Sequence, residues 1–364
     1  MTIKYRNYHG WRNDRNFCRN CSGEIPISLE SLKKSAFIYG GQQDVPTEIA
    51  FWKENNILPF SQVNKNQPSL FKNFEYLEST EKGMVAFYIG MAFAQLHMSE
   101  VYGVKQLFHL RNLRDWGMLE TRNGTRIPDF WGKGENNQSY VVEAKGTTQP
   151  QNFMQLTTLG DAVRQVQAVV AVEDTKTNHT YSMKKCDLKQ VVIGTHRCRR
   201  NEITQQVIVL ANSNCPQIPE CAESMDNDLS RSNFPIEYER EELGEEVLKL
   251  DSGVLMSLYY KNVLELIETR RPQKTSISEN VFLMVDVPEM NCRLGLLEEV
   301  YMELKESEDK NSGISVGYKW ANALKINQIL DEKLGKNEAH KVNAETRGIH
   351  LASDGVIIME LKKD

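Results

Sequence analysis

The sequence lacks any hydrophobic run long enough to cross a membrane. Its longest apolar stretch, residues 83–94, is far shorter than the roughly 20 residues that a membrane-spanning helix needs. The chain also lacks an apolar segment behind a charged N-terminal start, so we expect no secretory signal peptide. Both absences predict a cytoplasmic protein with no membrane partner.

The cysteines give no sign of a disulfide framework. There are 7 among 364 residues, an odd number in a large chain, which favours reduced thiols. Cys18 and Cys21 form a C-x-x-C pair that would supply half of a zinc site, but no second pair with this spacing follows. Two interpretations of this pair therefore remain, a zinc site and two incidental thiols.

The net charge of −5 gives no general indication of affinity for nucleic acid. The charge is uneven, because residues 1–40 are mainly basic and residues 220–268 are strongly acidic. Aromatic and basic side chains also mix in residues 1–24. Such a mixture can contact nucleic acid, and it is equally typical of a solvated arm.

The strongest chemical pattern is the stretch RIPDFWGKGENNQSYVVEAKG, residues 126–146. If residues 140–146 form a β-strand, the two-residue period of its side chains places Glu143 and Lys145 on one face and the alternate apolar residues in the core. Asp129 precedes a segment rich in glycine and asparagine, which are turn formers. Two antiparallel strands joined by that turn would bring Asp129 beside Glu143.

Two carboxylates in this arrangement provide hard oxygen ligands for Mg²⁺, which keeps several waters and completes its shell with substrate phosphate. The metal would polarise the phosphoryl oxygens and lower the pKa of a bound water, while a lysine stabilises the developing charge or orients that water. The pattern therefore predicts metal-assisted phosphodiester hydrolysis, with Asp129 and Glu143 holding Mg²⁺ or Mn²⁺ and Lys145 facing the phosphate.

The PD and ExK residues resemble the motif of the PD-(D/E)xK nuclease superfamily, which has the restriction-endonuclease-like fold. In that family the two acids bind metal and the lysine is catalytic, and these roles carry over to Asp129, Glu143 and Lys145. The surrounding elements resemble the family's α-β-β-β-α-β core. We expect helices over residues 81–99 and 157–172, strands over 104–110, 140–146, 190–195 and 205–211, and a further strand carrying Asp129.

The resemblance also suggests two more site residues, since some family members add a glutamate on the first helix and a glutamine or basic residue on the second. Glu81 is the candidate for a third metal ligand, with Glu100 as the alternative. Gln165 is the candidate for a further catalytic residue, with Gln167 next. Neither glutamine is followed four positions later by tyrosine, which is a departure from the exonuclease-like branch of the family.

The fold class that we expect is α/β, with a restriction-endonuclease-like core around a central mixed sheet and an additional α/β region. The expected division is a basic and aromatic extension over residues 1–80, the nuclease-like core over 81–211, a linker or long loop over 212–235 and a C-terminal α/β region over 236–364. In that last region we expect helices over residues 237–268, 294–305 and 318–334, a strand over 281–287 and a hairpin over 349–361.

The sequence therefore suggests a divalent-metal-dependent nuclease that acts on DNA, by analogy with the family, within a bacterial restriction or anti-phage defence system. The alternative is a catalytically silent nuclease-fold module that binds nucleic acid or a partner protein in a complex. An ATPase as partner and a homo-oligomer are further expectations, since the second half of the chain has no assigned role.

Overall fold

The structure, a computed structural model, describes residues 2–11, 18–41, 46–57, 62–64, 67–69, 74–110, 127–134, 137–148, 157–197, 202–211, 245–306, 321–335, 339, 342–343 and 348–361. Among these residues, no helix is long and apolar enough to cross a membrane. The chain forms two compact units, and each is built from two segments. Unit 1 contains Met1–Ile27 and Pro59–Leu250, and unit 2 contains Ser28–Leu58 and Asp251–Asp364.

These units differ from the four consecutive blocks that the sequence suggested. The expected extension over residues 1–80 is divided between the units, because its apolar side chains are buried in two different places. Ile3 and Ile25 are buried on strands of unit 1, whereas Leu32 and Phe37 are buried on a helix of unit 2. The expected linker over residues 212–235 lies outside the described residues.

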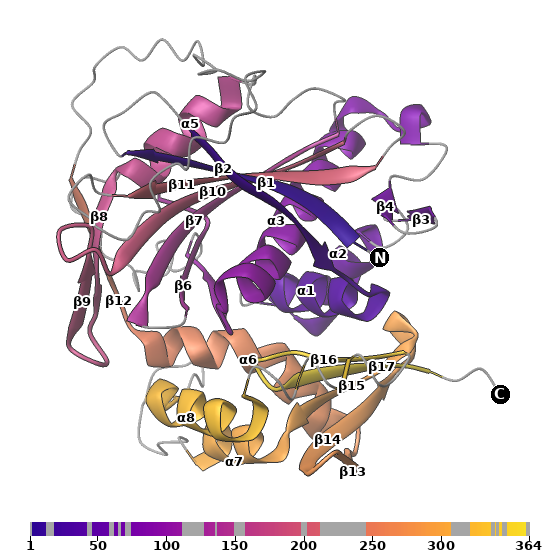
Figure 1. Cartoon of the computed structure of the whole chain (residues 1–364). Helices are drawn as coiled ribbons and strands as arrows, with labels where there is room; N and C mark the ends of the chain where they lie inside the picture. The colour runs from indigo at the N-terminus through magenta and orange to yellow at the C-terminus, as the bar shows by residue number, and fades with distance from the viewer. Residues whose placement is uncertain are drawn as a thin grey trace. The chain divides into compact units, whose positions relative to one another are not determined.

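Unit 1 has an α/β fold around a seven-stranded mixed sheet (Figure 1). β1 pairs with β11, and β7 with β10, in parallel, and the other neighbours pair antiparallel. In spatial order the strands are Cys18–Pro26 (β2), Thr2–Trp11 (β1), Ile203–Ala211 (β11), Leu188–Arg197 (β10), Ser139–Thr147 (β7), Phe130–Lys133 (β6) and Leu107–His109 (β5).

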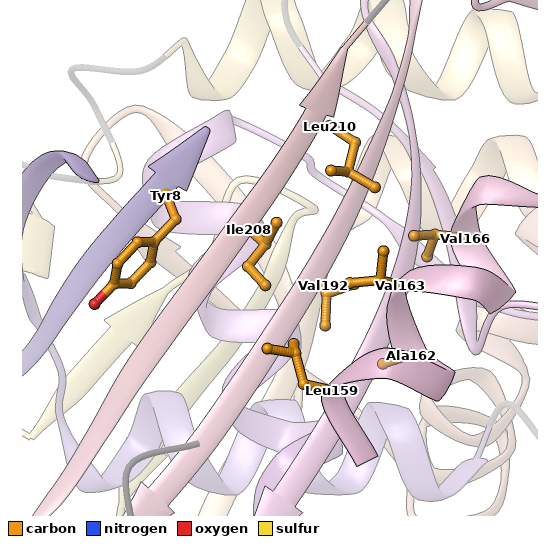
Figure 2. Close-up of a cluster of buried hydrophobic side chains, with 8 residues drawn as sticks. All are labelled: Tyr8, Leu159, Ala162, Val163, Val166, Val192, Ile208 and Leu210. Atoms are coloured by element: carbon orange, nitrogen blue, oxygen red, sulfur yellow. The ribbon is translucent and has the colours of Figure 1, made fainter. Parts of the chain in front are cut away.

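The helices α3 (Ser79–Tyr102) and α5 (Thr157–Gln167) cover opposite faces of this sheet (Figure 1). α3 begins with a capping box between Glu78 and Glu81 and ends at Gly103, whose φ of 62° is left-handed. α5 is amphipathic, and its apolar side chains pack on β10, β11 and β1 (Figure 2). This buried cluster contains Tyr8, Leu159, Ala162, Val163, Val166, Val192, Ile208 and Leu210.

Unit 1 also has smaller elements outside the central sheet. Val169–Asp174 (β8) pairs with His179–Ser182 (β9) and with Glu246–Leu250 (β12) in a three-stranded sheet. Gln62–Asn64 (β3) and Gln67–Ser69 (β4) form a two-stranded ribbon, and the 3₁₀ helix η2 spans Phe74–Tyr76.

Three expected helices begin or end elsewhere because short apolar runs become strands. The helix expected over residues 157–172 ends at Gln167, and the valines that follow form β8, where β-branched side chains pack well. The helix expected over 237–268 is replaced at residues 246–250 by β12 and begins only after Asp251, whose carboxylate caps it. The helix expected over 294–305 begins at Glu298.

Unit 2 contains a five-stranded antiparallel sheet in the order β13-β14-β15-β17-β16. Its strands are Gln273–Ile277 (β13), Asn280–Val287 (β14), Cys292–Leu297 (β15), Ile349–Leu351 (β16) and Val356–Glu360 (β17). The expected strand over 281–287 and the expected hairpin over 349–361 are confirmed. Its helices are Leu29–Gly41 (α1), Thr47–Ile57 (α2), Ser252–Thr269 (α6), Glu298–Glu306 (α7) and Ala323–Leu334 (α8), with the 3₁₀ helix η6 at Pro288–Met290.

A buried polar network joins the two segments of unit 2. Lys34 on α1 forms an ion pair with Asp354, which lies in the turn between β16 and β17, and both side chains are buried. Tyr259 on α6 donates to the Asp354 carboxylate at 2.5 Å, and Tyr260 donates to the Asp354 carbonyl at 2.6 Å. The carboxylate therefore has both a cation and a hydroxyl as partners, as buried charges require.

The cysteines follow the expectation of reduced thiols only in part. Cys292 is free and buried, whereas Cys186 is disulfide-bonded. The side chains of Cys18 and Cys21 lie outside those that the structure describes, so the question of zinc at this pair stays open.

Candidate active site

Glu143 and Lys145 lie on the face of the central sheet that α5 covers. In the parallel register of β7 and β10, Glu143 stands opposite Val192, which belongs to the apolar cluster under α5. Side chains alternate along a strand, so Lys145 shares this face and Gly146 points to α3. A Cβ on Gly146 would meet the carbonyl oxygen of Ala86 on α3, which agrees with this alternation.

Asp129 meets Glu143 across the antiparallel pair of β6 and β7. Phe130 stands opposite Val142, and Asp129 is the residue just before β6. The Asp129 amide donates to Oε2 of Glu143 at 3.1 Å, and the Ala144 amide donates to Oδ2 of Asp129 at 3.0 Å. The two carboxylates are thus held close together by reciprocal backbone hydrogen bonds.

Lys145 completes the group from the same strand. Its Nζ donates to Oε1 of Glu143 at 2.5 Å. The Glu143 side chain is 1% exposed, whereas that of Lys145 is 32% exposed. The ammonium therefore lies between the buried carboxylate and solvent, where a charged substrate could reach it.

The electrostatics at Glu143 are unfavourable to its charge. Burial raises the pKa of Glu143 to about 8, and the negative charge of Asp129 contributes to the rise. The ion pair with Lys145 lowers the pKa without reversing the effect. A divalent cation bound by both carboxylates would remove the repulsion between them and favour the ionised form of Glu143.

Two of the ligands that a hard cation such as Mg²⁺ would need are present, the carboxylates of Asp129 and Glu143. Two carboxylates at one point are enough for Mg²⁺, which commonly binds through one or two carboxylates and keeps several waters. Among the described residues no third protein ligand joins them, since these residues contain no group of three or more Asp, Glu, His or Cys side chains that could hold a metal.

Glu81 does not join Asp129 and Glu143. It is exposed in the first turn of α3, and its carboxylate accepts a hydrogen bond from the Glu78 amide at 2.8 Å. α3 covers the face of the sheet opposite to the two carboxylates (Figure 1). The role of Glu81 here is therefore to cap the helix. The alternative, Glu100, lies near the other end of the same helix.

Gln165 lies on the same side of the sheet as the two carboxylates, but it contacts the backbone before Asp129. Its Nε2 donates to the carbonyl oxygen of Ile127, two residues ahead of Asp129. This bond ties α5 to the segment that enters β6, which is a positioning role. Gln167, the alternative, is buried at the end of α5.

The main contributors that the sequence did not reveal are backbone groups. The Ala144 amide and the Ile127 carbonyl fix Asp129 and Gln165, yet every residue type supplies the carbonyl and every type except proline supplies the amide. Only the strand register identifies them, so no residue pattern could have predicted their involvement.

No protein-family model, no curated protein and no solved structure matches this chain.

Proposed function

We propose that this chain is a divalent-metal-dependent nuclease that hydrolyses phosphodiester bonds in DNA. The observation that carries the proposal is the interlocked pair of carboxylates, Asp129 and Glu143, with the Lys145 ammonium on the same strand and at the solvent side. A buried carboxylate with a second carboxylate beside it has an unfavourable charge unless a cation is bound.

Each side chain has a separate role in this proposal. Asp129 and Glu143 would hold Mg²⁺ or Mn²⁺, which supplies Lewis acidity and a more acidic bound water. With its charge no longer needed by Glu143, the Lys145 ammonium would contact the phosphoryl oxygens and stabilise their developing charge. Gln165 keeps α5 against residue 127, which holds Asp129 in register with β7.

The order of elements supports the choice of reaction. α3, β5, β6, β7, α5 and β10 follow the α-β-β-β-α-β order that the nuclease superfamily shares, and the sheet is mixed. β8 and β9 are inserted before β10 and form part of a separate sheet. The choice of DNA, and a place in a restriction or anti-phage system, extend the same analogy.

The test is cleavage of supercoiled plasmid, single-stranded DNA and RNA by the purified full chain with Mg²⁺ or Mn²⁺. We expect nicking or linearisation of DNA that EDTA abolishes. Lys145→Ala should slow cleavage by about 100-fold or more, as expected when a group that stabilises transition-state charge is removed. Asp129→Asn should also abolish cleavage, although its side-chain oxygen can still accept from the Ala144 amide.

Lys249→Ala is the matched control for Lys145→Ala. Lys249 also faces a glutamate of unit 1, Glu173, at 3.8 Å, but that pair is exposed on the three-stranded sheet. The control should cleave at the parental rate. If Lys145→Ala were to cleave as fast as this control, the site would have no part in the mechanism.

A catalytically silent module is the second candidate, and one observation favours it. Both oxygens of Glu143 already have donors, Lys145 and the Asp129 amide, so the group is satisfied without metal. In that case the unit would serve to bind nucleic acid or a partner protein. Calorimetric titration with Mn²⁺ separates the two candidates, since only the nuclease should show binding that Asp129→Asn removes.

A further inference from the structure

Four strands of the central sheet are basic, although the chain as a whole is acidic. The net charge of the chain is −5, yet β2, β1, β11 and β10 together contain five Lys or Arg residues and a single acid, Glu24. The five basic residues are Lys4, Arg6, Arg19, Lys189 and Arg197. Such charges attract an anionic partner where they share an open face with the candidate active site.

Arg6 on β1 shares such a face with Lys145. Arg6 stands opposite Gln206 on β11. Gln206 stands opposite Gly194 on β10, which in turn stands opposite Lys145 on β7. Tyr8, two positions after Arg6, identifies the face, because it belongs to the apolar cluster under α5 (Figure 2). Arg6 and Lys145 are therefore the two ends of one row across the α5 side of the sheet.

Of the four residues in this row, the two at its ends reach solvent. Gly194 has no side chain, and Gln206 is 4% exposed. Arg6 is exposed, and the Lys145 side chain is 32% exposed. A ligand that lies across the row therefore meets one cation at each end.

The strands on both sides of Arg6 place no acid directly opposite it. Its cross-strand neighbours are Gln206 on β11 and Ser22 on β2, which carry no charge. Glu24, the acid of these strands, stands opposite Lys4 instead, which puts it on the diagonal from Arg6, at about 7–8 Å. The Arg6 guanidinium therefore lies in a polar surface where a phosphate can approach it.

The positive field of Arg6 extends toward the strand beside Lys145. Burial lowers the pKa of His196 on β10, and the positive charge of Arg6 contributes to the fall. Three strand spacings separate Arg6 from Lys145, about 14 Å at roughly 4.8 Å each. A DNA duplex carries about eight phosphates over this length, at roughly one per 1.7 Å of axis. Both cations can therefore contact the backbone of one duplex at the same time.

We infer that Arg6 binds a backbone phosphate of the DNA, about 14 Å from the phosphate that is hydrolysed, so that β1 forms part of the DNA-binding surface. The inference rests on the proposed function, because it takes Lys145 as the point where the hydrolysed phosphate lies. It also assigns a role to the basic N-terminal strand, which the candidate active site does not use.

The test is binding of a short DNA duplex to the full chain in EDTA, measured by fluorescence anisotropy over a range of salt concentrations. Arg6→Gln should lower the slope of log affinity against log salt by about 0.9, the value for one phosphate contact on duplex DNA. Arg6→Lys keeps the charge and should keep the slope of the parent. Circular dichroism and the urea midpoint should match the parent in both variants, because the side chain that changes is exposed.

Lys249→Gln is the matched control for Arg6→Gln. It also removes one exposed strand cation from unit 1, but Lys249 lies on β12, outside the central sheet. The control should leave the salt slope unchanged. If Arg6→Gln and Lys249→Gln changed the slope equally, Arg6 would make no phosphate contact and the inference would be wrong.

Steady-state cleavage with Mg²⁺ gives an independent measurement. Arg6→Gln should raise KM for DNA and leave kcat unchanged, because a contact away from the reacting phosphate stabilises the bound substrate and the transition state equally. Lys145→Ala should lower kcat instead. A fall in kcat with an unchanged KM in Arg6→Gln would overturn the assignment of Arg6 to substrate binding.

The outcomes separate this inference from the proposed function. If Arg6→Gln lowers the salt slope but the parent cleaves no nucleic acid with Mg²⁺ or Mn²⁺, the nuclease proposal fails and the DNA-binding surface stands. If cleavage depends on Asp129 while Arg6→Gln binds DNA as the parent does, the surface is wrong and the nuclease proposal stands. If polyglutamate displaces the duplex as well as unlabelled DNA of equal charge does, the surface suits an acidic protein and the inference of DNA is overturned.

Discussion

Glu143 is a buried carboxyl group with a carboxylate and an ammonium as its nearest charged neighbours. Its folded pKa, about 8, lies above its ordinary value of 4.5. Between these two values the folded chain therefore retains a proton that the unfolded chain releases. The contribution of Glu143 to stability is greatest at low pH and falls as the pH rises through this window, by up to about 1.4 kcal/mol per pH unit.

Glu143→Gln should therefore stabilise the metal-free chain at pH 8 relative to the parent, with no difference near pH 4. The amide carries no charge, so its burial and the Asp129 carboxylate no longer oppose folding. Urea unfolding in EDTA at several pH values measures this, and addition of Mn²⁺ should stabilise the parent alone. A parent that was more stable than the variant at pH 8 without metal would contradict the stated electrostatics.

His97 on α3 should produce the opposite dependence on pH. It is fully buried and bonded to Gln205 at 2.9 Å, and burial lowers its pKa from 6.5 to about 4. The unfolded chain thus binds a proton between these values that the folded chain does not. The stability from His97 is present above pH 6.5 and is lost as the pH falls toward 4, by up to about 1.4 kcal/mol per unit.

The measurement compares His97→Gln with the parent by urea unfolding at pH 4.5 and pH 7, so that all other titrating groups cancel. The unfolding free energy of the variant minus that of the parent should be more positive at pH 4.5 than at pH 7. His179→Gln, which changes an exposed histidine on β9, should follow the parent at both pH values.

At the scale of elements, the contact between α3 and β7 depends on two glycines. A Cβ added to Gly90 would lie 2.7 Å from the Gly146 nitrogen, and one added to Gly146 would meet the Ala86 carbonyl. The atoms that each added Cβ would meet belong to the backbone, so no side chain can rotate to relieve the clash. The helix can therefore approach the strand that carries Glu143 and Lys145 only because both side chains are absent.

Gly90→Ala should destabilise unit 1 by about 1–3 kcal/mol, the usual cost of overpacking. Gly83→Ala on the same helix is the control: nothing lies within 4 Å of the added Cβ, so helix propensity should make it more stable by up to about 1 kcal/mol. Denaturant unfolding measures both. Equal effects of the two variants would show that the contact is not tight.

The elements near the site were predictable because their patterns admit one interpretation. The long apolar helix and the Val-rich strand with Glu143 and Lys145 both form where expected. The apolar runs at 169–172 and 294–297 fit the period of a helix as well as that of a strand, and only their pairing with another strand decides that they are strands. Likewise, residues 2–11 resembled an arm, although in the structure they pair with β11 about 200 positions later.

The sequence predicted those residues of the candidate site that act through their side chains. The structure brings Asp129, Glu143 and Lys145 together, as the strand periodicity suggested. It does not bring Glu81 to them, because an acid at a helix start is also the ordinary residue for a capping box. Which face of the sheet a helix covers is a tertiary property that local sequence does not encode.

At the scale of the molecule, unit 2 depends on an ion pair between its two chain segments. Removing Lys34 would leave the Asp354 carboxylate buried without a cation. We expect Lys34→Ala to destabilise unit 2 by about 3–5 kcal/mol, the usual effect of breaking a buried pair. Hydrogen exchange read by mass spectrometry should show faster exchange in β16, β17 and α1, while the peptides of unit 1 stay protected.

Lys333→Ala is the control within the same unit. Lys333 pairs with Glu299 at 2.7 Å, but both side chains are about 40% exposed, so its loss should cost less than about 1 kcal/mol. If both variants exchanged at the parental rate, the buried network would not hold the two segments together.

The ion pair between Lys34 and Asp354 also sets an order in time. The lysine is made early and its partner 320 residues later (354 − 34). At roughly 5–20 residues per second of synthesis, α1 waits about 15–60 s on the ribosome before its carboxylate partner exists. During that interval α1 can pack against α2 and later against α6, but the strands β16 and β17 that flank Asp354 are still absent, so unit 2 is completed after unit 1.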